Sequence, residues 1–346
     1  MKQILQDLTK EEIVRLVLSL GEKKFRADQI YLGLMQGKKI SELPVSTTLR
    51  EALLAQFEDE PVKIIETFVS KEDGTKKFLF ALADGNLIEG VFMKHQYGNS
   101  QCVSTQVGCR MGCKFCASTL NGLLRNLTAG EILSQILLVN RLEGGNLKDR
   151  AVKNVVLMGS GEPFDNYDNV IRFLKNLTAE GGINISARNV SLSTCGLVPE
   201  IKKFASEGIP VTLAISLHAV TDAERFRTMP IANKYGIREI LDACSEYFEK
   251  TGRRYIFEYS LISGENCDEE HALSLSRLLK GRPCHVNLIK LNEVKERNLK
   301  SSSDKEANRF LEILEQQGIS ATFRRSMGSD IGGACGQLRA KYMGDG

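Results

Sequence analysis

Cys109-Arg-Met-Gly-Cys113-Lys-Phe-Cys116 is the stretch from which the organisation of this chain follows. Its three cysteines share one loop, with three and then two residues between them. Three thiolates at this spacing can hold a 4Fe–4S cluster and leave one iron without a protein ligand. A small molecule can bind at that open corner, as it does at a catalytic zinc. Structural zinc is the alternative, although such a site needs a fourth ligand and none of suitable spacing follows nearby.

Short apolar runs alternate with amphipathic segments around and after this loop, which predicts alternating strands and helices. Strands are expected near 102–107, 154–158, 188–194, 210–216, 254–261, 284–290 and 319–325. Helices are expected near 128–142, 166–179, 197–206, 236–249, 268–280 and 303–316, and Thr128 with Glu131 forms a capping-box pattern at the first of them. Repeated units of this kind predict an α/β fold with a parallel sheet, either open or closed into a barrel. Ligands of such sheets bind at the C-terminal ends of the strands.

The residues before this region read differently. Helices are expected at 9–20, 27–36 and 46–57, and Thr9 with Glu12 forms a capping-box pattern at the first of them. Asp-Gly pairs separate three apolar runs at 62–70, 76–83 and 87–94, which predicts an antiparallel meander. We therefore expect four parts: a helical unit at 1–58, a β extension at 59–94, a barrel region at 95–325 and a C-terminal segment at 326–346.

The composition is that of an ordinary globular protein, with 346 residues, 42% hydrophobic residues and a net charge of +3. No apolar run approaches the roughly 18 residues of a membrane span, and no signal-peptide core is expected at the N-terminus. Nine cysteines, an odd number, suit metal binding in a reducing, cytoplasmic setting better than disulfides.

Two basic clusters, Lys23-Lys24 with Arg26 and Arg324-Arg325, are by default solvated surface.

Seven short motifs occur in a fixed order and extend this pattern. They are Gln106-Val-Gly-Cys109, Arg125-Asn-Leu-Thr-Ala-Gly-Glu131, Gly159-Ser-Gly-Glu-Pro163, Ser216-Leu-His218, Arg227-Thr-Met-Pro230, His285-Val-Asn-Leu-Ile289 and Ala334-Cys-Gly-Gln-Leu338. Together they resemble the RlmN/Cfr family of radical S-adenosylmethionine (SAM) RNA methyltransferases, and most closely its RlmN branch. The resemblance covers almost the whole chain.

The resemblance implies a radical SAM partial (β/α)6 barrel with an N-terminal helical unit and a small antiparallel β-meander. It implies one 4Fe–4S cluster per chain on Cys109, Cys113 and Cys116, with SAM on the fourth iron and two SAM molecules used per turnover. The implied reaction is methylation of carbon-2 of an adenosine in 23S rRNA and of one beside the tRNA anticodon. A radical route suits this carbon because it has no usable lone pair and cannot attack a sulfonium methyl group.

The resemblance also assigns residue roles. Cys335 would be the methyl acceptor that forms S-methylcysteine, Cys102 the resolving thiol that forms a transient disulfide with it, and Glu89 the proton acceptor. The implied SAM contacts are Gly161, Glu162, Ser193, Ser216, Leu217, His218 and Asn292. Read without the resemblance, Glu89 would be a solvent-facing strand residue, and His218 a core histidine.

Several positions depart from the family pattern or have no role in it. The departures are Ser160, Cys195, Gly332 and Gly333, and none of them removes a catalytic group. Cys195, Cys244, Cys267 and Cys284 are expected to be small buried side chains.

The implied partners are 23S rRNA, tRNA and a reducing electron donor such as flavodoxin, with no membrane and a monomeric state. The helical unit at 1–58, with Lys23, Lys24 and Arg26, would bind RNA. Three alternatives stay open: methylation of carbon-8, as in the Cfr branch and in ribosomal antibiotic resistance; a radical SAM enzyme of another type; and a zinc-stabilised RNA-binding protein.

Overall fold

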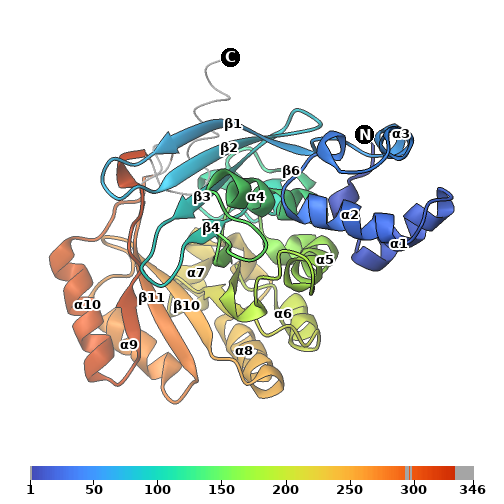
Figure 1. Ribbon diagram of the computed structural model, residues 1–346. Helices are drawn as coiled ribbons and strands as arrows, with labels where there is room; N and C mark the ends of the chain where they lie inside the picture. Colours follow the sequence, from blue (N-terminus) through green and yellow to red (C-terminus); the bar gives the residue numbers. More distant parts are fainter. Residues whose placement is uncertain (1, 293–295, 297, 332–346) are drawn as a thin grey trace.

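One sheet of ten strands organises the protein, whose computed structural model describes residues 2–292, 296 and 298–331 (Figure 1). The strands follow each other in the order β1-β2-β3-β4-β7-β8-β9-β10-β11-β12. Neighbours from β1 to β4 pair antiparallel, and neighbours from β4 to β12 pair parallel. Their bounds are β1 Val62–Val69, β2 Lys76–Leu82, β3 Leu87–Met93, β4 Ser100–Cys102, β7 Asn154–Leu157, β8 Val190–Thr194, β9 Thr212–Ser216, β10 Tyr255–Leu261, β11 Cys284–Lys290 and β12 Ala321–Phe323.

Helices connect the parallel strands and cover the outer face of the sheet, as Figure 1 shows. They are α4 Ala129–Leu142, α5 Tyr167–Thr178, α6 Val198–Ala205, α7 Asp222–Thr228, α8 Ile237–Thr251, α9 Glu269–Leu279 and α10 Asp304–Gln316. The expected α/β partial barrel is confirmed. Helix α4 begins at the capping box predicted from Thr128 and Glu131, in which each residue bonds the backbone N–H of the other.

The predicted strand near 102–107 is not continuous. It divides into β4 and β5, which is Gln106–Gly108, and β5 pairs antiparallel with β6, Leu123–Asn126, in a small second sheet. The chain leaves the main sheet because the amides of Thr105 and Gln106 both donate to the carbonyl of Ser160, at 2.9 and 3.1 Å. This turn carries the cysteine loop away from the barrel wall and over its C-terminal edge.

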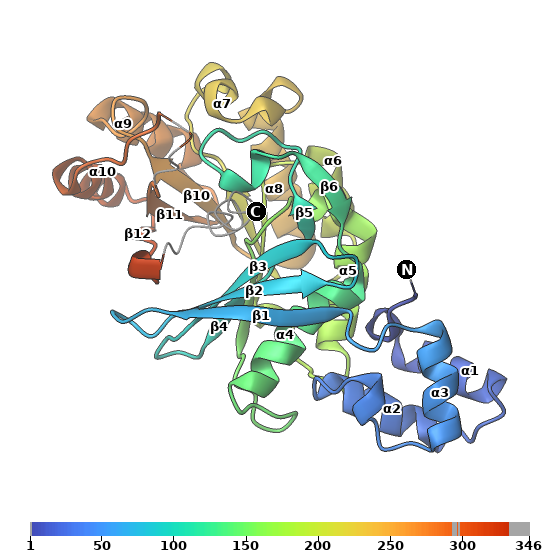
Figure 2. The ribbon, with the colours of Figure 1, turned by 90° about the horizontal axis from the view of Figure 1, so that it is seen from above.

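The helical unit consists of α1 Lys10–Ser19, α2 Phe25–Met35 and α3 Thr47–Gln56. It lies beside α4 and α5, as both ribbon views show (Figures 1 and 2). The Asp7 carboxylate accepts the Gly130 amide at 2.6 Å, and Arg172 on α5 pairs with Glu12 on α1 at 3.0 Å. The N-terminal unit is thus joined to the barrel by specific polar contacts and by a shared apolar core.

The predicted meander of β1, β2 and β3 is present, with a register irregularity between Ile64 and Glu66. It continues the barrel sheet because β3 pairs directly with β4. After β12 the chain returns to the turn between β1 and β2, and its last described element is the 3-10 turn η7, Ser329–Ile331. Gly332, Gly333 and Cys335 lie outside the described residues. No helix in the described ranges combines the length and apolar content that crossing a membrane requires.

Candidate cluster and cofactor site

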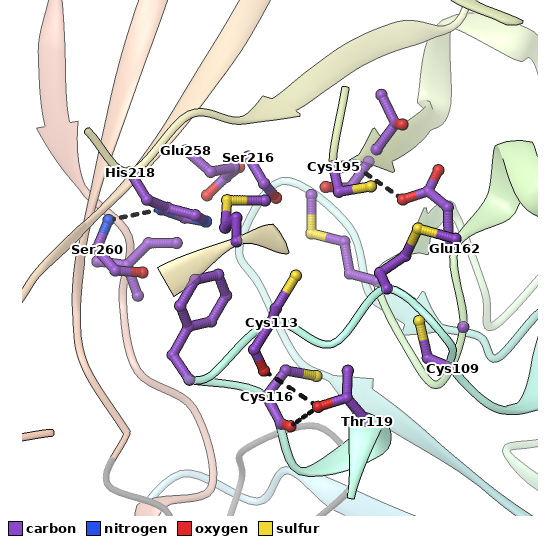
Figure 3. A pocket seen from close by; sticks show the side chains of 18 of the residues that line it. Cys109, Cys113, Cys116, Thr119, Glu162, Cys195, Ser216, His218, Glu258 and Ser260 are labelled. Atoms are coloured by element: carbon purple, nitrogen blue, oxygen red, sulfur yellow. Dashed lines mark hydrogen bonds between the residues drawn. The ribbon is translucent and has the colours of Figure 1, made fainter. Parts of the chain in front are cut away.

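A cavity of about 250 Å³ lies at the C-terminal edge of the parallel strands (Figure 3). The sequence placed its predicted cluster and cofactor residues at the ends of different strands, and the structure brings most of them to this cavity. Its lining includes Cys109, Cys113, Cys116, Gly161, Glu162, Ser193, Ser216, His218 and Asn292. Leu217 is fully buried between two of these residues and is not part of the lining.

The cysteine loop is held in shape by its own backbone. The Cys109 amide donates to the Gly122 carbonyl at 2.9 Å, which closes the loop across β5 and β6. The Thr119 hydroxyl donates to the carbonyls of Cys113 and Cys116, at 3.1 and 2.9 Å. Because the carbonyls are tied back in this way, the three thiols are left around a common space, as Figure 3 shows.

Burial disfavours the thiolate forms of Cys109 and Cys113. It raises the pKa of Cys109 to about 12, and it raises that of Cys113 further. A metal cation offsets the unfavourable free energy of burying the thiolate, because the thiolate, not the thiol, binds the metal. Among the described residues, no group of three His, Cys, Asp or Glu side chains is placed to hold a single metal ion. Three thiolates can hold a 4Fe–4S cluster and leave one iron open, whereas a structural zinc site needs a fourth protein ligand.

Gly161, which lines the cavity, packs too closely against Gln106 to be replaced by a residue with a side chain. Its φ is +108°, and a Cβ at this position would lie 2.6 Å from the Cβ of Gln106 and 2.8 Å from its amide nitrogen. Gln106 in turn accepts the Glu162 amide through its side-chain oxygen at 2.8 Å. The loop after β7 is thus fixed against the start of the cysteine hairpin.

The Glu162 carboxylate is buried at the cavity wall. One of its oxygens accepts the Cys195 amide at 2.8 Å, and the other accepts the Phe164 amide at 3.1 Å. Burial raises the pKa of Glu162 in spite of these bonds. A cationic group bound in the cavity would lower this pKa and favour the carboxylate. Cys195 is buried as expected, but it also lines the cavity beside Glu162, which the sequence did not indicate.

His218 lies on the opposite side of the cavity, in a left-handed backbone conformation with φ +58°. Its Nδ1 accepts the Ser260 amide at 2.9 Å, and its ring meets Phe115 edge-on at 4.7 Å. Burial lowers the pKa of His218 to about 3, and the nearby Arg225 lowers it as well. The imidazole is therefore neutral, and with Nδ1 accepting, its proton is on Nε2.

Arg225 is a structural residue that the sequence analysis missed. It is fully buried, and its guanidinium donates to the carbonyls of Cys195, Ser216 and Leu217 at 2.5, 3.1 and 3.2 Å. These bonds connect the loop after β8 to the end of β9, so that Arg225 fixes two walls of the cavity. Its place on a short helix rich in charged residues gives no local sign of burial.

Glu89 and Cys102 lie on the neighbouring strands β3 and β4, where Val91 pairs with Cys102. Both side chains are buried, so the solvent-facing position that Glu89 would have by default is wrong. Neither lines the cavity of the three cysteines. Cys335 falls outside the described residues, so its place relative to them stays a prediction.

The remaining residues singled out in the sequence differ in their exposure. Lys23 and Lys24 are exposed, whereas Arg26 is half-buried beside Glu22 and Gln29. Arg324 is not simple solvated surface, because it lines the cavity and lies 3.7 Å from Glu258. Three other cysteines have no implied role, and their side chains are buried as expected: Cys244, Cys267 and Cys284.

Comparisons with known proteins identify what this arrangement is similar to. Residues 103–275 match the model of the radical SAM superfamily. A protein of Clostridium perfringens (strain SM101 / Type A) named "Probable dual-specificity RNA methyltransferase RlmN" is 54% identical over 99% of this chain and 98% of its own length. A protein of the same name from Alkaliphilus metalliredigens is 51% identical over 99% and 96%. The crystal structure of a radical SAM methyltransferase from Sphaerobacter thermophilus superposes with a TM-score of 0.92, at 40% identity over 97% of this chain and 98% of that one.

Proposed function

Because the chain belongs to the RlmN family of radical SAM RNA methyltransferases, we propose that it methylates carbon-2 of an adenosine in 23S rRNA and of one beside the tRNA anticodon. The observation that carries this proposal is the composition of one cavity at the barrel edge. It gathers three cysteines from one loop together with residues from the ends of β7, β8, β9 and β11. A cluster and a nucleotide cofactor can therefore meet there.

In this proposal Cys109, Cys113 and Cys116 hold the 4Fe–4S cluster. The burial of Cys109 and Cys113 and the raised pKa of each thiol fit a cationic metal centre. When bound, the cluster and SAM supply the one-electron radical chemistry that an unreactive ring carbon requires. One cluster per chain and two SAM molecules per turnover complete the proposed stoichiometry.

The chain's own residues orient SAM. Glu162, held by two backbone amides, accepts the ammonium group of its methionine part. Gly161 keeps the loop after β7 packed against Gln106, because a side chain there would meet Gln106, and this packing places Glu162 at the cavity wall. His218 can donate from Nε2, because its Nδ1 is already occupied by the Ser260 amide. Ser193, Ser216 and Asn292 line the same cavity and supply further polar contacts.

Three further residues act on the methyl group and on RNA. The Cys335 thiolate would take a methyl group from one SAM, with S-adenosylhomocysteine leaving. A hydrogen atom of this methyl group would pass to the radical that the cluster and a second SAM supply, and its carbon would bond carbon-2 of adenine. Glu89 would remove the carbon-2 proton while one electron returns to the cluster. The Cys102 thiolate would then attack the sulfur of Cys335, which breaks the carbon–sulfur bond, leaves a Cys102–Cys335 disulfide and lets the product carbon take up a proton. The pairing of β3 with β4, which keeps Glu89 and Cys102 on adjacent strands, supports this assignment.

RNA binding is assigned to the helical unit at 1–58. Lys23 and Lys24 are exposed at the start of α2, where phosphate groups can reach them. We also propose a flavodoxin-type reductant as electron donor, a monomeric state and a cytoplasmic location. The net charge of +3 permits these partners without deciding among them.

The test is product identification. Reconstituted enzyme is incubated with SAM, reductant and RNA, the RNA is digested, and the methyladenosine isomer is identified by mass spectrometry. We expect 2-methyladenosine from the wild type and from Cys244→Ala, a buried cysteine on α8 that is outside the cavity. Cys335→Ala and Cys113→Ala should give none. Formation of 8-methyladenosine, or zinc in place of iron and sulfide in the purified protein, would overturn the proposal.

A further inference from the structure

The chain crosses from the last barrel strand to the β extension just before the described residues end. At Arg324 it is still bonded to β11, through its amide and the Leu288 carbonyl at 2.8 Å. Four residues later Gly328 reaches the turn between β1 and β2. Both ribbon views place η7, the red segment before the grey trace, beside that turn (Figures 1 and 2).

Two reciprocal hydrogen bonds hold this crossing in place. The Gly328 amide donates to Oδ2 of Asp73 at 2.9 Å. The Lys71 amide donates to Oδ2 of Asp330 at 2.8 Å. Each side thus provides one carboxylate and one backbone N–H, and we call these two bonds the tail clamp. Bonds between an ionised carboxylate and an amide are stronger than bonds between neutral groups.

The turn between β1 and β2 is shaped to present Asp73. The Ser70 hydroxyl oxygen accepts the amides of Glu72 and Asp73 at 3.2 Å each, and Oδ1 of Asp73 accepts the Thr75 amide at 2.9 Å. Its other oxygen is therefore directed outward to Gly328. Burial tends to raise the pKa of Asp73, but the amides of Gly328 and Thr75 outweigh it and hold the pKa at about 2. The carboxylate is charged at any physiological pH.

The other side of the clamp is equally specific. Gly328 has a φ of +65°, and a Cβ there would lie 3.1 Å from the Thr75 methyl group. A glycine is thus required both by the backbone conformation and by the closeness of the turn. Asp330 also bonds the Ser70 hydroxyl, so that one serine contacts both halves of the clamp.

We propose that the tail clamp positions Cys335, with Asp73 and Asp330 as positioning residues for methyl transfer. The proposal rests on the role of Cys335 proposed above. Cys335 follows Asp330 by five residues, and five extended residues span at most about 18 Å. The clamp therefore holds the chain at a fixed point five residues before the acceptor cysteine. Confinement of this kind raises the effective concentration of one reacting group near another. The β extension thus anchors the C-terminal segment at 326–346, which carries Cys335.

Two measurements test the proposal on the full chain. Amide hydrogen exchange of the cluster-free protein reports protection at Lys71 and Gly328. Peptide mass spectrometry after incubation of the reconstituted protein with methyl-deuterated SAM reports the rate at which Cys335 gains a methyl group. The variants are Asp73→Ala, Asp330→Ala and the conservative Asp73→Asn, which keeps an acceptor oxygen. Lys71→Ala is the matched control, because its amide, not its side chain, enters the clamp.

We expect both alanine variants to lose amide protection and to methylate Cys335 about tenfold more slowly or worse, with iron content, SAM affinity and Tm unchanged. Asp73→Asn should restore part of the rate, and Lys71→Ala should match the wild type. Lost protection with an unchanged methylation rate would reduce the clamp to a structural contact and overturn the proposal. Retained protection in Asp73→Ala would refute the contact itself. Wild-type protein that never methylates Cys335 would instead overturn the proposed function and this proposal with it.

Discussion

Replacing Arg225 with methionine tests whether one buried side chain holds the cofactor cavity together. Methionine keeps much of the apolar stem but removes every donor, so that the carbonyls of Cys195, Ser216 and Leu217 lose a partner. A buried polar group without its partner costs roughly 1–3 kcal/mol. The substitution also removes the desolvation penalty of the buried Arg225 guanidinium, which offsets part of that loss of stability. We expect a net loss of about 3 kcal/mol in the free energy of unfolding, or about 5 °C in Tm.

SAM binding should weaken as well, because Cys195 and Ser216 line the cavity at the ends of two different strands. We expect the Kd for SAM, measured by equilibrium dialysis on reconstituted protein, to rise about tenfold, which corresponds to about 1.4 kcal/mol. Arg227→Met is the control: its side chain is 59% exposed and lies 3.4 Å from Glu265, so its loss should cost less than about 0.5 kcal/mol. Equal values of Tm and Kd for the two variants would refute the role given to Arg225.

Three further predictions concern other parts of the protein. Gly161→Ala should lower the stability by about 2 kcal/mol and weaken SAM binding, since its φ is +108°; an unchanged denaturation midpoint would contradict this. The lowered pKa of His218, about 3, means that the unfolded chain binds a proton that the folded chain does not. Stability should therefore be complete above the unfolded pKa of about 6.5 and fall by about 1.4 kcal/mol per pH unit below it. Urea titrations of cluster-free protein at pH 7 and pH 5 should show this loss in the wild type but much less of it in His218→Asn. Replacing Lys23, Lys24 and Arg26 with alanine should reduce the slope of log K for RNA against log salt by about 2, and an unchanged slope would exclude that surface.

Local signals made most of the fold predictable. The capping boxes at Thr9 and Thr128 depend on residues three positions apart, and both form as read. The β5–β6 hairpin could not be read in the same way. It begins inside a run that looks like one strand, and what divides the run is the carbonyl of Ser160, more than fifty residues later in the sequence. Helix α7 was not predicted, because its seven residues are too few to show a helical periodicity of apolar positions.

Within the site, too, the features with a local sequence signal were predictable and the others were not. The cysteine loop and the motifs at strand ends predicted the cavity, because parallel strands bring their C-terminal ends together. Arg225 and Cys195 were missed because their importance depends on which backbone groups from distant segments surround them. The tail clamp was missed for the same reason, as Asp73 and Gly328 are 255 positions apart.

The contacts between the N-terminal helices and the barrel have a consequence for substrate selection. Asp7 bonds Gly130 at 2.6 Å, and a Cβ on Gly130 would lie 2.6 Å from the Ile4 side chain. Arg141 adds a link to Glu42 at 2.6 Å. These contacts fix the helical unit relative to the barrel. In the proposed function this unit holds RNA at a set distance from the cluster cavity, so that an RNA would be selected by whether its shape presents a flipped-out adenosine at that distance, rather than by base sequence alone.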